Sequence, residues 1–173
     1  MAANTQIKIS NAVVHVNGQP VLGGPNEVTI EAVKIKAIEM TSMGMVGTIE
    51  LFGGIDKMAG SMKLNHVSSD IVSKLCQTID FTQVQVRSVH EVVSASGVTY
   101  KACVYNMSIR SNTALPGFAH KAQEMAEFDV EYSIMALSME IDSVEIFKFD
   151  PMANIYKING VDQLAQQNAI LGI

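Results

Sequence analysis

Residues 127–134 alternate strictly between polar and large apolar side chains, and this pattern constrains the fold of the 173-residue chain more than any other feature. Acidic or hydroxyl side chains occupy the odd positions, and Phe, Val, Tyr and Ile occupy the even ones. Successive side chains of a β-strand point to opposite faces, so the pattern predicts a strand with one buried and one wet face. Such half-buried strands are typical of antiparallel sheets.

Further strand-like runs cover much of the chain. Residues 81–93 and 98–109 are two such runs, and the short polar segment 94–97 between them predicts a β-hairpin. Between residues 28 and 37 the alternation slips by one position after Ala32, which predicts a β-bulge or a bend. Tight turns are predicted at Asn17-Gly18 and at Asp142-Ser143.

Only two segments carry a helical pattern. Ser69-Asp70 is a predicted N-cap before apolar residues at helical spacing. Residues 161–171 form the second predicted helix, with Gly172 at the stop position. Many strands with two short helices predict a mainly β fold: an antiparallel β-sandwich or barrel with one flanking α-helix, a short C-terminal helix and a long hairpin arm. No linker or repeat divides the sequence, so we expect residues 1–173 to form one domain.

The composition narrows the class of protein. Hydrophobic residues make up 48% and charged residues 17%, a combination that excludes disorder for most of the chain. The net charge of −5 excludes a basic nucleic-acid binder. We find no secretory signal and no apolar run of membrane-spanning length, and Cys76 and Cys103 fit reduced thiols, so we expect folding in a cytoplasm. A low content of charge is common in chains that bury surface in an assembly.

Sequence motifs for catalysis are missing. The four histidines are isolated from one another, and the sequence contains no GxSxG, Walker or GxGxxG motif. Cys76 and Cys103 lack a CxxC spacing and a nearby histidine, so a metal site on them is not expected. We therefore expect no enzyme, no cofactor and no metal, although the absence of motifs does not exclude an enzyme.

Residues 40–62 hold five of the eleven methionines and five of the twelve glycines. Glycine lets backbones approach closely, and methionine adapts to irregular partner surfaces, so this segment favours an extended hairpin arm used in assembly. The alternative is a mobile hairpin whose methionines fill the domain's own core. The candidate contact residues of the arm are Met43, Met45, Ile49, Leu51, Phe52, Ile55 and Met58.

Charge is unevenly distributed along the chain. Residues 124–150 contain eight acids and one base, a net charge of −7, whereas the remaining residues carry eleven bases and nine acids, a net charge of +2. Such an acidic face is usually only solvated. Repeated around a ring, however, it would produce a surface with a strong field of one sign.

The C-terminal sequence carries a family resemblance. Residues 159–166 read Asn-Gly-Val-Asp-Gln-Leu-Ala-Gln and are followed by Leu171-Gly172-Ile173, a run that closely resembles the C-terminus of major tail tube proteins of contractile-tail phages. The resemblance extends upstream to an early Val-Asn-Gly loop, to residues 48–58 and to residues 145–150, so it covers nearly the whole chain.

The resemblance implies a structural function. Members of this family stack as hexameric rings into a hollow tube inside a contractile sheath, and strands of six subunits close one inner β-barrel around the lumen. It implies a homo-oligomer with sheath, baseplate and tail terminator proteins as partners, a tail location in the virion, assembly in the host cytoplasm, and DNA that passes through the lumen without specific binding. The resemblance implies no cofactor and no metal. In this family a long hairpin reaches the neighbouring ring, and residues 40–62 hold the matching position.

Two further groups of residues are expected to act in a tube. The C-terminal helix is expected to dock on the domain or on a neighbour through Val161, Leu164, Ala165, Ile170 and Leu171. A wall that guides DNA should not bind phosphate, so we expect an acidic face to line the lumen, with Glu127, Asp129 and Glu131 as its residues. The rival placement of that face is outward, toward the sheath.

Two alternatives to a phage tube stay open at this point. The chain could form the tube of a phage-tail-like bacteriocin or of another contractile injection system, whose subunit has nearly the same task. It could also be a small acidic binding barrel or an enzyme with a pocket, which would be a monomer or dimer.

Overall fold

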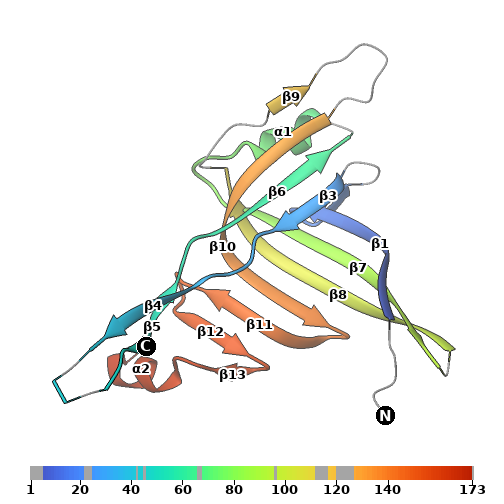
Figure 1. Ribbon diagram of the computed structural model, residues 1–173. Helices are drawn as coiled ribbons and strands as arrows, with labels where there is room; N and C mark the ends of the chain where they lie inside the picture. Colours follow the sequence, from blue (N-terminus) through green and yellow to red (C-terminus); the bar gives the residue numbers. More distant parts are fainter. Residues whose placement is uncertain are drawn as a thin grey trace.

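Strand β10 (Glu127–Ile141) is shared by the two layers of the fold. The computed structural model describes residues 6–21, 25–41, 43–44, 46–65, 68–95, 97–111, 117–119 and 127–172 (Figure 1). The first half of β10 pairs with β6 and β9, and its second half pairs with β8 and β11. A register shift between Ile134 and Ala136 moves the buried positions from even to odd, because a bulge inserts one unpaired residue.

The larger layer, here called the long layer, has the strand order β13-β12-β11-β10-β8-β7-β1-β2. All of its pairings are antiparallel. Its other strands are β1 (Gln6–Val16), β2 (Gln19–Val21), β7 (Thr82–Ser94), β8 (Gly97–Arg110), β11 (Val144–Asp150), β12 (Ile155–Ile158) and β13 (Val161–Asp162).

The second layer, here called the short layer, crosses over the long one (Figure 1). It contains β3 (Pro25–Ile30), β6 (Met58–Leu64), the first half of β10 and β9 (Gly117–Ala119). Side chains from both layers form one hydrophobic cluster between them, including Val14, Val84, Met107, Met62 and Tyr132. The mainly β, antiparallel sandwich expected from the alternation is therefore confirmed.

Gly60 allows strands β6 and β10, at the centre of the short layer, to pack closely against each other. It lies opposite Tyr132 in the β6–β10 ladder, and a Cβ on Gly60 would come within 2.6 Å of the Thr29 carbonyl oxygen and 2.7 Å of the Tyr132 ring. The Tyr132 side chain is 1% exposed, and burial raises the pKa of its hydroxyl above the ordinary value. This glycine thus belongs to the core and not to a flexible arm.

In the part of the chain that the structure describes, three two-residue turns have both central residues at positive φ, as a type I′ hairpin turn requires. They are Asn17-Gly18 at 49° and 80°, Asp142-Ser143 at 50° and 66°, and Asn159-Gly160 at 48° and 75°. The first two confirm the turns predicted from the sequence, and the third joins β12 to β13.

The first helix, α1 (Ser69–Leu75), lies close to its predicted position. Its N-cap is Ser68, whose side chain accepts a hydrogen bond from the Ile71 N–H, and Leu75 is the buried residue of its apolar stripe. The cap is thus one residue earlier than the predicted Ser69-Asp70.

The C-terminal helix α2 (Ala165–Leu171) is shorter than predicted. The expected start at Val161 is wrong, because the Asn159-Gly160 turn returns the chain into the β12–β13 ladder at Val161 and Asp162. Gly172 ends the helix in the left-handed conformation with φ 73°, as the sequence predicted.

The hairpin arm occupies different residues from those expected. β4 (Ile35–Met40) and β5 (Ile49–Ile55) form a separate two-stranded sheet, which projects beside β12 and α2 (Figure 1). The arm is therefore the segment 35–55. The expected end at residue 62 is wrong, because Met58 and Met62 belong to β6 and are only 4% and 1% exposed. The bend predicted after Ala32 separates β3 from β4.

Candidate assembly surfaces

The arm has one apolar face, which its strand register defines. Ile38 pairs with Leu51 and Met40 pairs with Ile49, so these four side chains share one face of the β4–β5 sheet. They are between 40% and 53% exposed. Here this set is called the arm face. A two-stranded sheet is marginally stable alone in water, so an exposed apolar face on it indicates a missing partner.

The other face of the arm is held by the chain itself at the base. The rings of Phe52 and Tyr156 are stacked, with centroids 5.8 Å apart and planes 10° apart. Phe147 and Phe149 meet Tyr156 edge-on at 6.4 Å and 6.1 Å. Ile55 and Leu164 line the same hollow as Phe52 and Tyr156. The expected contact residues Phe52 and Ile55 therefore anchor the arm to the body.

The remaining expected arm residues lie in three different places. Met43, at the tip, is fully exposed, as is the neighbouring Val46. Ile49 and Leu51 belong to the arm face. Met58 is a core residue, so a contact role for it is wrong. Met45 lies outside the described residues.

Helix α2 is held to the preceding loop by hydrogen bonds of Asn168, whereas its apolar side chains are exposed. The Asn154 and Asn168 side chains are hydrogen-bonded, and the Asn168 amide also donates to the Asn154 carbonyl at 3.2 Å. Leu164 is half-buried beside the arm base. The other expected docking residues are exposed, with Val161 at 63%, Leu171 at 67% and Ile170 at 86%; Ala165 is exposed as well.

The short layer presents an acidic face. Glu127, Asp129 and Glu131 are exposed and alternate with the buried Phe128, Val130 and Tyr132, as predicted. Lys63 lies opposite Asp129 in the ladder, and its ammonium is 3.3 Å from the Glu27 carboxylate. The hydrogen bond to Glu27, with the charges of Glu27, Asp129 and Glu127, raises the pKa of Lys63. The Lys63 ammonium therefore interacts with three acids, Glu27, Asp129 and Glu127.

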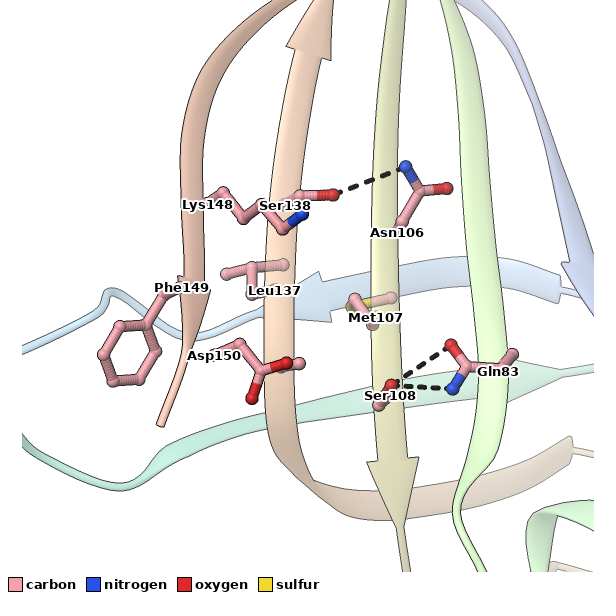
Figure 2. A pocket seen from close by; sticks show the side chains of 10 residues that line it. Gln83, Asn106, Met107, Ser108, Leu137, Ser138, Lys148, Phe149 and Asp150 are labelled. Carbon is pink, nitrogen blue, oxygen red and sulfur yellow. Dashed lines mark hydrogen bonds between the residues drawn. The ribbon is translucent and has the colours of Figure 1, made fainter. Parts of the chain in front are cut away.

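The long layer presents a polar face on its side away from the core. Figure 2 shows Gln83 bonded to Ser108 and Asn106 bonded to Ser138. The donor–acceptor distances are 2.8 Å and 3.4 Å, and these residues line a shallow hollow of about 120 Å³. Gln85 also bonds Asn106. We did not identify this face from the sequence, although Gln83 and Gln85, like Asn106 and Ser108, alternate with buried residues.

An apolar groove opens between the two layers. It has a volume of about 670 Å³ and is lined mostly by apolar side chains of β1, β3, β7, β8, β10 and β11, including Ile9, Val14, Val28, Val86, Tyr105, Leu137 and Phe147. Ser88 and His90 are the polar pair in its floor, with Oγ and Nε2 3.0 Å apart. Among the described strands, β3 pairs only with β6, so no ladder closes the gap between β3 and β1.

The accessible surface of this chain is larger than that expected for a folded monomer of its mass. The accessible surface is 11680 Å². A folded monomer of 18.7 kDa exposes about 8,300 Å², so about 3,400 Å² is in excess. An excess of exposed surface is expected of a chain that buries surface in an assembly.

Among the described residues, no group of three or more His, Cys, Asp or Glu side chains is placed to hold a metal ion. Neither helix in the described part of the chain has the length and apolar character needed to cross a membrane.

The sequence matches the family model of the phage tail tube protein FII over residues 6–172. The chain belongs to this family. The family resemblance found at the C-terminus is therefore confirmed, and the protein is a structural tail tube protein. No curated protein matches the sequence.

Two solved structures share the fold of this tail tube protein. One is the sheath–tube complex of PVC, an extracellular contractile injection system, in the extended state; the identity is 12%, the TM-score is 0.54, and the match covers 78% of this chain and 91% of that chain. The other is the sheath/tube terminator of PVC in the extended state, with 11% identity, a TM-score of 0.54, and coverage of 78% and 96%. At these identities the likeness shows a common fold.

The two ends of the C-terminal segment are expected to respond differently to mutation. Leu164→Asp places a charge in the apolar hollow beside Phe52 and should lower the free energy of unfolding by about 1–3 kcal/mol. Ile170→Asp, at a position that is 86% exposed, should change it by less than about 0.5 kcal/mol. Urea denaturation of dispersed subunits measures both, and equal losses would contradict the assignment of Leu164 to the arm base.

Proposed function

We propose that six copies of this tail tube protein form a ring and that the rings stack into a hollow tube inside a contractile sheath. The observation that carries the proposal is the family match over residues 6–172, together with the excess of exposed surface in one chain. The resemblance to a sheath–tube complex and to a tube terminator supports sheath and terminator proteins as partners, with the baseplate at the other end.

The tube serves as the conduit for genome ejection, so the protein is a virion component that is assembled in the host cytoplasm. It performs no catalysis. In this proposal the long layers or the short layers of six copies pair edge to edge into one inner β-barrel, which removes the open edges of the sheet. The tube of a bacteriocin or other contractile injection system stays the alternative, because its subunit would meet the same constraints.

The arm and the C-terminal helix serve as contacts between copies. The arm face and Met43 supply the stacking contact, and the exposed side chains of Val161, Ala165, Ile170 and Leu171 supply further apolar contacts. Ile170→Asp is therefore expected to lower the yield of tubes while the stability of the subunit is kept.

Electron microscopy of the purified protein at high concentration tests the proposal. Rings or tubes with six-fold symmetry are expected. A monomer at every concentration, together with tails from which this protein is missing, would overturn it.

We place the acidic face on the wall of the lumen. The support is the exposure of Glu127, Asp129 and Glu131 in one row, with Lys63 as a cation near Glu127 and Asp129. Acids repel phosphate, so DNA slides along such a wall, whereas cations would add affinity that is independent of sequence.

Charge reversal distinguishes the lumen from the sheath side. Glu127→Lys, Asp129→Lys and Glu131→Lys together are expected to give sheathed tails that eject DNA slowly. The matched control adds cations to the polar face of the other layer with Gln83→Lys and Gln85→Lys, and it should eject at the normal rate. Bare tubes from the acidic-face variant would place that face toward the sheath, and slow ejection by the control alone would place the polar face in the lumen.

A further inference from the structure

We propose that the arm face of one copy packs into the apolar groove of a second copy in the adjacent ring. The inference rests on the proposed stacking function and adds the surface that receives the arm. It joins the arm face, formed by Ile38, Met40, Ile49 and Leu51, to the groove between the two layers.

Both surfaces are apolar, and neither is covered by another of the residues that the structure describes. The arm's opposite face is anchored by Phe52 on Tyr156, so the arm face is directed away from its own body at the base. The groove is open because β3 pairs only with β6 among the described strands. Ile7 and Ile9, which continue the floor of the groove along β1, are 65% and 62% exposed.

The sizes of the two surfaces agree. The arm face covers three residues on each strand, which is about 7 Å along the strand and about 5 Å between strands. The groove floor extends from Ile9 to Val14 on β1, about 17 Å, so it can accept the whole face with its side chains. Its volume of about 670 Å³ is in the range of sites that enclose several apolar groups.

The charges also agree with this occupant. The four side chains of the arm face are uncharged, and the acids Glu39 and Glu50 lie opposite each other on the other face of the arm. The acid in the groove lining is Glu27, which Lys63 already neutralises at 3.3 Å. Packing of the arm face therefore forces no unpaired charge into an apolar site.

A second copy is favoured over another protein because the arm and the groove belong to the same chain. Two different surfaces that fit each other make a heterologous contact, which repeats from copy to copy and builds a polymer. Stacked rings of identical subunits require a contact of this kind along the tube axis.

Engineered disulfides test the contact. In a Cys76→Ser, Cys103→Ala background that forms tubes, one preparation carries Leu51→Cys on the arm face and the other carries Ile9→Cys in the groove. Assembled together and oxidised, they should give a cross-linked dimer, and neither preparation alone should do so. Ile7→Cys, on the same face of β1 and equally exposed, is the second groove variant.

The matched control replaces Ile9→Cys by Tyr100→Cys. Tyr100 is 67% exposed and one register position away, on the opposite face of the same sheet, so it reports random collision. Cross-linking with Tyr100→Cys as strong as with both groove variants would overturn the inference. A chain that carries both Leu51→Cys and Ile9→Cys should form a ladder that extends beyond six copies, and a ladder that stops at six would overturn the axial placement.

The failure of this inference is distinct from the failure of the proposed function. Six-fold tubes seen by microscopy without a Leu51–Ile9 or Leu51–Ile7 cross-link would support the proposed tube function but reject the proposed docking site. If the cysteine-free protein does not form tubes although the wild type does, the experiment is repeated in a background that retains Cys103. This side chain is 1% exposed, so it is not accessible for cross-linking. Cross-links from Leu51→Cys to the sheath protein in place of Ile9→Cys would also reject the second copy as the occupant.

Discussion

The single constraint on which the rest of the structure depends is that β10 belongs to both layers. Its even positions face the core in the first half, and a bulge between Ile134 and Ala136 transfers burial to Leu137 in the second half. The bulge lets one strand leave β6 and join β8 without losing its apolar face. Gly60 makes the first half possible, because any side chain there would meet the Tyr132 ring and the Thr29 carbonyl.

The same arrangement explains why the chain is incomplete alone. Two layers joined through one bent strand share a well-filled core near the bend, around Tyr132, Met62 and Met107. Away from the bend the layers separate, which leaves the groove and the exposed Ile7 and Ile9. The arm departs on the other side with its own bare apolar face. For a tail tube subunit, these unfilled surfaces are where copies of the chain would complete one another.

Local features were predictable from the sequence, and features that depend on tertiary contacts were not. The Asn17-Gly18 and Asp142-Ser143 turns and the alternation along β10 follow from backbone preference and strand geometry, so they were predicted correctly. Gly60 resembled a glycine of a flexible arm, because its close neighbour Tyr132 is 72 positions away in the sequence. The start of α2 was missed because Val161 suits a helix face and a strand equally. The groove had no local signal, since it arises from how the layers separate.

Amide hydrogen exchange in dispersed subunits and in assembled tubes tests the central claim that assembly completes the apolar surfaces of this chain. We expect the amides of β4 and β5 to exchange rapidly in the dispersed subunit and to become strongly protected in the tube. Those in the paired centre of β10 should be protected in both. Equal protection of β4 and β5 in the two states would contradict the account, because the arm would then be stabilised by its own chain.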